Sequence, residues 1–231
     1  MQQKKVDEAI AEFERAIEFQ RDHAGAHFNL GYALAGVGWI KDAVEHFREA
    51  LKWRPDQAKT HHQLGLALRS LNQLDAATEE LDRARRLAPQ TAEICFDLGT
   101  VEARRGQTET ALASLREAIR LRPDWVEPLN YTAWLMATHS DRKVRRPHDA
   151  VDYAERAATL TARRDPAILD TLAAAYAASQ RFDEAVTTAE EAVELARLRG
   201  SSDLADRAGA RLALYRLRKP YREPRSPKST Q

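Results

Sequence analysis

The sequence predicts an all-α protein in which one pair of antiparallel helices is repeated along the chain. Three residue types recur at a fixed spacing of 34 positions: Pro55, Pro89 and Pro123, Gly31, Gly65 and Gly99, and Ala50, Ala84 and Ala118. Apolar residues recur between them at steps of three and four, which is the period of a helix and not of a strand. A fixed period of this length indicates helix pairs that stack in one dimension, each contacting only its neighbours.

The repeat register begins at Ala24. Three units follow without a gap, at residues 24–57, 58–91 and 92–125. Each unit has a glycine at its eighth place and an alanine at its twentieth, and these small residues let its two helices approach closely. The proline at place 32 cannot continue a helix, so it ends each unit.

Residues 4–23 are expected to form the second helix of a further unit. Ala9, Phe13 and Ala16 occupy places 20, 24 and 27 of that unit, and its first helix is missing. A stack of repeats needs a polar cap on its end helix. This leading half repeat therefore predicts that the chain is a fragment of a longer protein.

Two less regular units are expected downstream, at residues 126–164 and 166–199. The first fits the register if its inter-helix turn is lengthened by five residues, roughly from His139 to Pro147. The second begins with a proline at the first helical position, and Asp165 is its expected N-cap.

A closing helix is expected at residues 203–217, with Asp203 as its cap. Its apolar side chains would cover the last unit, as the end of a helical stack requires. The array of helices then spans residues 1–218. The remaining segment, 219–231, is basic and contains prolines, so it is predicted to be disordered.

Composition narrows the possible functions. The chain is 43% apolar and carries a formal net charge of +1, which gives no global attraction to nucleic acid or membrane. Its longest apolar run, 172–178, is far shorter than the roughly 20 residues of a membrane span. Val6 to Phe19 reads as an amphipathic helix and not as a secretory signal. The single cysteine, Cys95, precludes an intrachain disulfide, so we expect a cytoplasmic protein.

The recurring residues resemble the tetratricopeptide repeat family over about residues 6–199. This resemblance implies a right-handed α-solenoid, and it implies a non-catalytic scaffold that binds a peptide or protein segment in a concave groove. Residues 129–162 and 170–176 also resemble the C-terminal repeat region of large bacterial multidomain proteins. In those proteins the repeats follow glycosyltransferase, sulfatase or kinase modules, so a substrate-presenting region of a larger enzyme is the alternative function.

The family implies that places 2, 5, 6, 9, 12 and 13 of each first helix line the groove. These places give the predicted partner-binding residues: Phe28, Asn29, Tyr32, Lys59, His62, Gln63, Arg69, Phe96, Asp97, Thr100, Arg104, Asn130, Tyr131 and Trp134. In the fifth unit they add Asp170 and Thr171. The set mixes flat rings with short hydrogen-bonding side chains, which suits an extended peptide. The alternative is that the rings pack against neighbouring repeats.

Two ligand modes known in the family match this sequence poorly. The clamp for a C-terminal carboxylate needs other residue types where Phe28, Tyr32, Glu93 and Asp97 stand. An asparagine at place 6 of successive units holds the peptide backbone in protein O-linked sugar transferases. Here only Asn29 matches that ladder.

No sequence motif indicates an enzyme, a cofactor or a metal. His61 and His62 are adjacent, and successive helical residues point about 100° apart, so the two cannot share a metal from one face. His61 and Cys95 both occupy place 4, where a structural role in the helix seam is expected. Glu102 stands at an apolar seam place, so it is a predicted weak point unless it is exposed or pairs with an arginine such as Arg104 or Arg105.

Basic residues crowd the long turn and the tail: Arg142, Lys143, Arg145, Arg146, Arg216, Arg218, Lys219, Arg222, Arg225 and Lys228. Such clusters can contact phosphates, which makes nucleic-acid binding a second alternative function. Solvated turns and tails are commonly charged, however, and no basic stripe interleaved with aromatic residues continues onto the helices. Nucleic acid is therefore not the expected partner.

Overall fold

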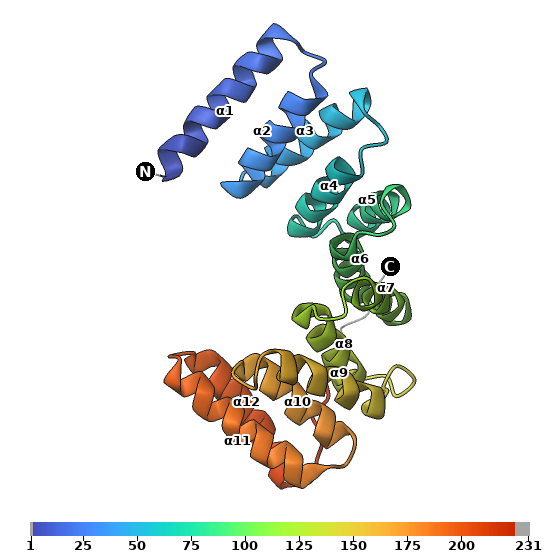
Figure 1. Cartoon of the computed structure of the whole chain (residues 1–231), viewed down its shortest axis with the longest axis vertical. Coiled ribbons are helices and arrows are strands. Elements are labelled where there is room, and N and C mark those ends of the chain that lie inside the picture. The colour runs from blue at the N-terminus through green and yellow to red at the C-terminus, as the bar shows by residue number, and fades with distance from the viewer. Residues whose placement is uncertain (1, 225–231) are drawn as a thin grey trace. The chain divides into compact units, whose positions relative to one another are not determined.

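The computed structural model describes residues 2–224, with side chains described from residue 6 onward. Every helix or strand assigned in this part is an α-helix, which confirms the predicted all-α class (Figure 1). The twelve helices are α1 (Gln2–Phe19), α2 (Ala24–Gly36), α3 (Ile40–Trp53), α4 (Ala58–Ser70), α5 (Leu74–Leu87), α6 (Ala92–Arg104), α7 (Thr108–Leu121), α8 (Val126–Thr138), α9 (Pro147–Leu160), α10 (Pro166–Ala178), α11 (Phe182–Leu198) and α12 (Ser202–Arg216).

The chain divides into two compact units, unit 1 (Met1–Leu121) and unit 2 (Arg122–Gln231). In unit 1 each helix from α1 to α7 packs on the next, and α4 also contacts α2 and α6. In unit 2, α8 packs on α9 and α10, α10 packs on α9 and α11, and α12 packs on α11 and α10. Both units thus consist of consecutive antiparallel helix pairs, as the period predicts.

The turn inside each pair of unit 1 depends on one residue with a left-handed backbone. Gly38 and Gly106 have φ angles of 88° and 77°, and Asn72 stands at the same place with a φ of 59°. After Gly38, the amide of Trp39 donates to the carbonyl of Leu34 at 2.9 Å. This hydrogen bond closes the helix end as in a Schellman motif, and glycine adopts the required φ without a Cβ penalty.

The glycine at the eighth place of each repeat is needed because the two helices of a pair touch there. A Cβ atom added to Gly65 would lie 2.6 Å from Cγ of Leu81 and 3.3 Å from the carbonyl oxygen of Ala77. Gly31 and Gly99 meet equivalent neighbours. The reason that the sequence suggests for these glycines, close helix approach, is therefore confirmed.

The long turn of unit 2 lies between α8 and α9, over residues 139–146. Its own arginine holds it in shape: Nη1 of Arg145 donates to the carbonyls of His139 and Ser140 at 2.8 and 3.0 Å. The amide of Arg146 donates to the carbonyl of Met136 at 3.1 Å, which ties the end of the turn back to α8. The lengthened turn is present as predicted.

The predicted helix caps have mixed outcomes. Oδ1 of Asp165 accepts hydrogen bonds from the amides of Ala167 and Ile168 at 2.8 and 3.3 Å, so Asp165 is the N-cap of α10. The prediction for α12 was wrong by two residues. Its N-cap is Ser201, and Asp203 lies in the first turn, where its charge favours the helix dipole.

Glu102 is half-buried in the seam between α6 and α7. The hydroxyl of Ser114 donates to its Oε2 at 2.7 Å, a partner that was not among the alternatives of exposure or an arginine pair that the sequence left open. Nη2 of Arg105 lies 2.5 Å from Oδ1 of Asp75 instead. Burial raises the pKa of the Glu102 carboxyl, and the bond from Ser114 opposes that rise.

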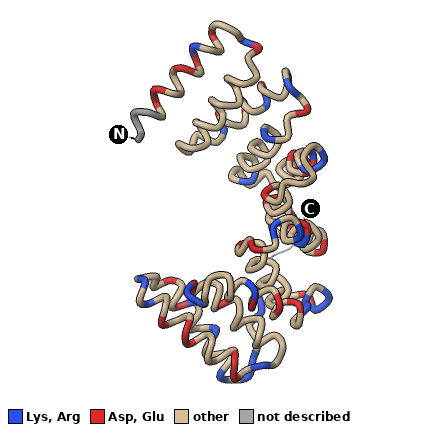
Figure 2. The backbone as a smooth tube through the Cα atoms, in the orientation of Figure 1, with Lys and Arg blue, Asp and Glu red and all other residues tan. Residues whose placement is uncertain are grey.

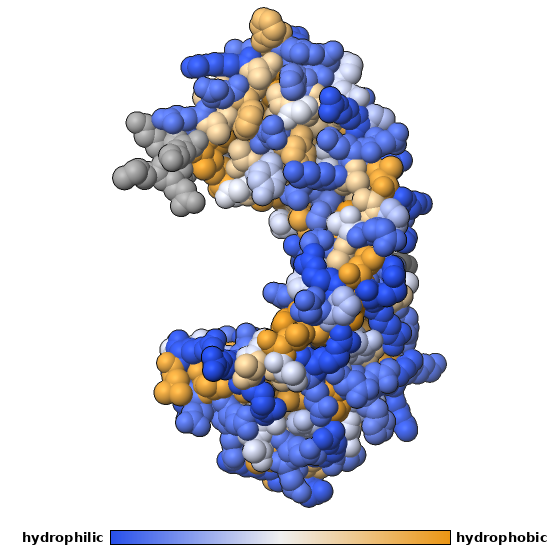
Figure 3. Space-filling view, in the orientation of Figure 1, coloured by the Kyte–Doolittle hydropathy of each residue, from blue (hydrophilic) through white to orange (hydrophobic). Residues whose placement is uncertain are grey.

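The surfaces of both units are predominantly polar. Lysine and arginine alternate with aspartate and glutamate along the helices (Figure 2), and hydrophilic side chains cover most of the visible face of each unit (Figure 3). Among the described residues, no helix combines the length and the apolarity that crossing a membrane requires.

Candidate functional site

The predicted partner-binding residues of unit 1 lie on α2, α4 and α6, the first helices of its three full pairs. We call them the first-helix face of unit 1: Phe28, Asn29, Tyr32, Lys59, His62, Gln63, Arg69, Phe96, Asp97, Thr100 and Arg104. Because α4 contacts both α2 and α6, side chains from three successive repeats meet on this face.

A polar network around Asp97 joins α6 to α4. Its Oδ2 lies 2.7 Å from Nε2 of His62, and its Oδ1 accepts a hydrogen bond from Nη1 of Arg69 at 2.9 Å. The same Nη1 lies 3.2 Å from Oγ1 of Thr100. The side chains of Arg69 and Asp97 keep 30% and 15% of their surface exposed, so a ligand can reach donors and acceptors that are already held in place.

The two aromatic residues of α2 on this face behave differently. Phe28 is only 8% exposed, and its ring centroid lies 5.9 Å from that of Phe47, so it packs in the core as the alternative interpretation expected. Nζ of Lys59 lies 5.1 Å over the Phe28 ring. Tyr32 is 58% exposed and stacks on Phe28 at 6.3 Å. Tyr32 is thus the accessible ring, and Phe28 supports it.

The rest of this face is held by weaker contacts. Arg104 of α6 donates to Oδ1 of Asn72 at 3.1 Å and to the carbonyl of Arg69 at 3.5 Å, again joining α6 to the preceding repeat. Asn29 is exposed, and Gln63 and Phe96 are half-buried. All eleven residues therefore lie on three helices in contact, and Tyr32, Lys59 and Arg104 are among the exposed side chains of this face.

The equivalent residues of unit 2 lie on α8 and α10. We call them the first-helix face of unit 2: Asn130, Tyr131, Trp134, Asp170 and Thr171. Asp170 is buried, and its two carboxylate oxygens accept from Nε and Nη2 of Arg211 on α12, with Nε at 2.9 Å. Burial raises the pKa of Asp170, and the bonds from Arg211 oppose that rise. The Oδ1 atom of Asn130 is buried without a hydrogen-bond partner in the described structure.

The chain beyond α12 lies against α8. Nε1 of Trp134 donates to Oε1 of Glu223 at 2.6 Å, and the ring of Tyr221 lies 5.8 Å from that of Trp134. The tail that was predicted to be disordered is thus placed on the first-helix face of unit 2 as far as residue 224, because aromatic and hydrogen-bonding contacts fix it. Residues 225–231 of that tail, including Arg225 and Lys228, lie outside the described residues.

Sequence reasoning missed Arg211, Tyr221 and Glu223, since none of them belongs to the repeat register. The signal for Arg211 was its position on α12, next to Leu212 and three residues from the buried Ala208. An arginine on the buried side of a closing helix requires a carboxylate partner. Nothing in the register indicated that this partner is Asp170.

The fourth place of each full repeat of unit 1 carries a buried side chain: His27, His61 and Cys95. Nδ1 of His61 lies 2.6 Å from Oε2 of Glu80, and its Nε2 lies 2.7 Å from the carbonyl of Pro55. These bonds join α4 to α5 and to the preceding turn, which is the structural role expected for His61. Cys95 is fully buried, and burial raises the pKa of its thiol. Among the described side chains, no three of histidine, cysteine, aspartate and glutamate gather in a way that could hold a metal.

Three family models match the sequence. A model described as TPR repeat matches residues 1–38, and two described as tetratricopeptide repeat match residues 24–57 and 62–126. Together they cover more than half of the chain. The chain is a tetratricopeptide repeat protein. Such repeats generally mediate protein–protein interactions. A comparison with curated protein sequences found no match to the chain.

Solved structures share the fold of this tetratricopeptide repeat protein. The structure of YrrB, titled as a TPR protein with an unusual peptide-binding site, is 18% identical with a TM-score of 0.71, covering 86% of this chain and 97% of YrrB. MamA is 20% identical with a TM-score of 0.64, covering 70% of this chain and 92% of MamA. Yeast Tom70 is 19% identical with a TM-score of 0.63, covering 90% of this chain and 43% of Tom70. At these identities the likeness shows the fold alone.

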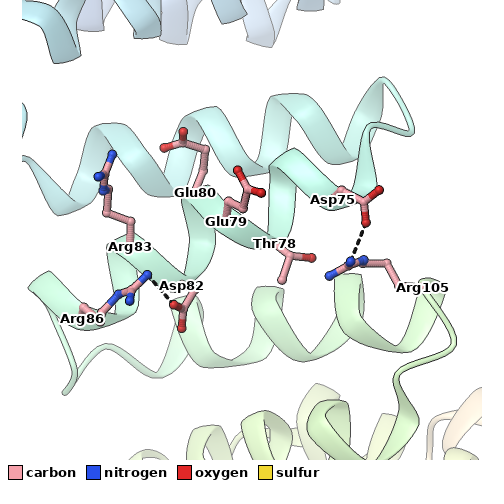
Figure 4. A pocket seen from close by; sticks show the side chains of 8 residues that line it. All are labelled: Asp75, Thr78, Glu79, Glu80, Asp82, Arg83, Arg86 and Arg105. Carbon is pink, nitrogen blue, oxygen red and sulfur yellow. Dashed lines mark ion pairs between the residues drawn. The ribbon is translucent and has the colours of Figure 1, made fainter.

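One surface hollow of this tetratricopeptide repeat protein lies on α5 and beside the end of α6 (Figure 4). Its lining residues are Asp75, Thr78, Glu79, Glu80, Asp82, Arg83, Arg86 and Arg105. Arg86 pairs with Asp82 at 2.7 Å, and Arg105 pairs with Asp75 at 2.5 Å. The hollow therefore neutralises much of its own charge, and it contains none of the predicted partner-binding residues.

Several of the basic side chains in the long turn and tail bond to the chain itself. Arg145 and Arg146 donate to carbonyls of the turn, and Nη1 of Arg222 donates to the carbonyl of Ala137 at 2.9 Å. Burial and the nearby charge of Arg145 lower the pKa of Arg222. These guanidinium groups are turned toward protein acceptors, which favours a structural role for them over phosphate binding.

Proposed function

We propose that the chain is a non-catalytic scaffold that binds a peptide or protein segment on the first-helix face of unit 1. The observation that carries this proposal is the alignment of three contacting first helices. They present an exposed ring, Tyr32, and a pre-positioned polar network around Asp97. The general role of the family and the peptide-binding site named for YrrB support the same class of function.

The chemistry of this face favours a ligand with an acidic side chain. Asp97 is already paired with Arg69 and lies within hydrogen-bond distance of His62, whereas Lys59 and Arg104 are exposed cations. An aspartate or glutamate of the ligand can pair with one of these cations while an apolar residue stacks on Tyr32. The free thiol of Cys95 is buried, which is compatible with the cytoplasmic setting that we propose.

The test begins with a library of random peptides selected on the immobilised full chain. We then measure the dissociation constant of the strongest peptide for the wild type and for Tyr32→Ala. A ring at the centre of a binding face contributes about 1–3 kcal/mol, so affinity should fall roughly 5- to 150-fold.

Trp53 provides a matched control, because it is 54% exposed and lies at the end of α3, a second helix of the same repeat. Trp53→Ala should leave the affinity unchanged. Selection of peptides that bind Tyr32→Ala as tightly as the wild type, or that are lost with Trp53→Ala alone, would overturn the proposed site.

A further inference from the structure

The C-terminal segment of the chain turns back sharply after α12. Arg218 has a φ of 55°, and the amide of Lys219 donates to the carbonyl of Leu214 at 3.0 Å. This Schellman-like end reverses the chain direction. Pro220 and Pro224 bracket the three residues that follow, and residues before a proline favour an extended backbone. The segment 220–224 is accordingly neither helix nor strand.

The main chain of this segment bonds to the end of α8. The amide of Glu223 donates to the carbonyl of Thr138 at 2.9 Å, and the side-chain Nη1 of Arg222 donates to the carbonyl of Ala137 at 2.9 Å. The last carbonyls of a helix have no partner within the helix. The carbonyl of Thr138 is therefore a fixed acceptor, and the main chain of an extended peptide can use it whatever the side chains are.

Two side chains of the segment meet groups of the first-helix face of unit 2. Glu223 accepts from the indole of Trp134 at 2.6 Å, and the ring of Tyr221 lies beside that indole. The guanidinium of Arg211 lies 5.3 Å from the Trp134 ring and 5.4 Å from the Tyr221 ring. Because Arg211 is itself locked to Asp170, the segment meets a rigid cation and a rigid ring.

Backbone bonds to fixed acceptors, with alternate side chains in specific contacts, are how an extended peptide ligand is recognised. We propose that the first-helix face of unit 2 is a binding site for an extended segment with an aromatic residue two positions before an acidic one. In this chain residues 220–224 occupy the site as an internal competitor. The inference rests on the proposed function, and it names the ligand class and its regulation for the second unit.

The internal segment limits binding of any outside ligand. A tethered segment has an effective concentration in the millimolar range, so an untethered peptide of the same sequence competes poorly. Removing contacts that the segment 220–224 makes with this face should raise the apparent affinity for the outside peptide about tenfold or more. The site is thus closed by default and opened by whatever displaces Tyr221 and Glu223.

The probe is a fluorescein-labelled peptide with the sequence Lys-Pro-Tyr-Arg-Glu-Pro, which is residues 219–224 of the chain. Its affinity is measured by fluorescence anisotropy for the full-length wild type and for the full-length double variant Tyr221→Ala, Glu223→Ala. The double variant should bind at least about tenfold more tightly. Lys219→Ala, an exposed change in the same segment, is the matched control and should bind as the wild type does.

Adding Trp134→Phe to the double variant keeps a ring and removes the indole donor. A hydrogen bond to a charged group contributes about 1.5–3 kcal/mol, so the added change should weaken binding roughly 10- to 150-fold. A labelled peptide with glutamine in place of its glutamate should lose affinity for the double variant in the same way. These losses would assign the peptide to the Trp134 site.

Equal affinity for the wild type and the double variant would overturn the inference. So would binding to the double variant that Trp134→Phe leaves unchanged but Tyr32→Ala removes. That result would place the peptide on unit 1 and leave the proposed function intact. Light scattering provides the remaining outcome: a wild-type dimer that becomes a monomer in the double variant would mean that the segment occupies a second copy, which also overturns the internal arrangement.

Discussion

Units 1 and 2 are built from the same helix pair, but the face of the first helices is open to solvent in unit 1 and covered by other parts of the chain in unit 2. In unit 1 the ring of Tyr32 and part of the Asp97 network are open to solvent. In unit 2, Trp134 stands at the repeat place of Tyr32 and Asp170 at the place of His62, and both are covered by α12 and the segment after it. The repeat therefore supplies a potential binding face, and residues outside the repeat determine whether it is accessible.

The largest effect is expected from breaking the buried ion pair that covers unit 2. Arg211→Ala would leave Asp170 buried without its partner, which costs about 3–5 kcal/mol in the free energy of unfolding. Amide hydrogen exchange of α10 and α12 measures this loss directly within unit 2. The amides of unit 1 should keep their exchange rates.

Arg207 on the same helix provides the control, since its pair with Asp203 is exposed. Arg207→Ala should change the exchange of α12 by less than about 0.5 kcal/mol. A second variant, Asp170→Leu with Arg211→Leu, removes both charges and should recover much of the loss. Equal, small effects of Arg211→Ala and Arg207→Ala would show that the ion pair between Arg211 and Asp170 does not stabilise the packing of α12 on α10.

The next effect concerns the seam of unit 1. Gly65→Ala would place a methyl group 2.6 Å from Cγ of Leu81, and such overpacking costs about 1–3 kcal/mol. Unit 2 already has alanines, Ala133 and Ala173, at the same place of its repeats. Exchange of α4 and α5 amides should therefore become faster, while α10 and α11 stay unchanged.

Gly36→Ala is the matched change, because no atom lies within 4 Å of a Cβ at Gly36. It should be neutral or slightly stabilising, since alanine has the higher helix propensity. Similar destabilisation by both changes would refute the steric explanation and indicate a backbone effect instead.

The features that the sequence predicts well are those that repeat. Gly65 and its equivalents predict close helix approach, and the register places Tyr32, His62 and Asp97 on contacting helices. The contacts by which α12 and residues 220–224 cover the first-helix face of unit 2 have no such signal in the sequence. Arg211 reaches a residue 41 positions away, and Glu223 reaches one 89 positions away. A period in the sequence carries no information about contacts that occur once.

The burial of Phe28 could not be predicted from its place alone. Phe28 and the exposed Tyr32 both stand at repeat places assigned to the groove, one helical turn apart on α2. Only Phe28 packs against Phe47 of the next helix. Which ring a ligand can reach therefore depends on side-chain packing across the pair. That packing is a property of the helix partner and not of the groove position.

Acid should weaken unit 1 through a pair of histidines. Nδ1 of His27 lies 3.0 Å from Nδ1 of His46. Burial and the neighbouring His27 lower the pKa of His46 below its ordinary value of 6.5, against the charges of Asp42, Glu14 and Glu49. The unfolded chain then binds a proton more readily, so this contribution to stability is present above about pH 6.5 and is lost as the pH falls.

The effect should be below about 1 kcal/mol, because His46 is partly exposed and screened. It is measured by exchange of α2 and α3 amides at pH 7.5 and 5.5, after correction for intrinsic rates. His46→Glu recreates the pair that His61 and Glu80 form one repeat later and should remove the acid sensitivity. The exposed His148→Glu in unit 2 is the control; an equal response to both would rule out the His27 contact as the cause.

The smallest effect sharpens the comparison at the turns within the helix pairs. Unit 1 has glycine at the left-handed place of two turns, whereas the last pair of unit 2 has Gln180 there with a φ of 65°. A Cβ in that conformation costs about 1–2 kcal/mol, and the entropy of glycine in the unfolded chain offsets about 0.5–1 kcal/mol of this. Gln180→Gly should therefore stabilise α10 and α11 by roughly 0.5–1 kcal/mol, measured by their amide exchange.

Asn72→Gly in unit 1 should gain less, since asparagine tolerates this backbone better than glutamine does. An equal gain in both turns would mean that asparagine and glutamine are equally strained in this conformation. A loss of stability in Gln180→Gly would mean that the Gln180 side chain stabilises the turn by more than the backbone strain costs.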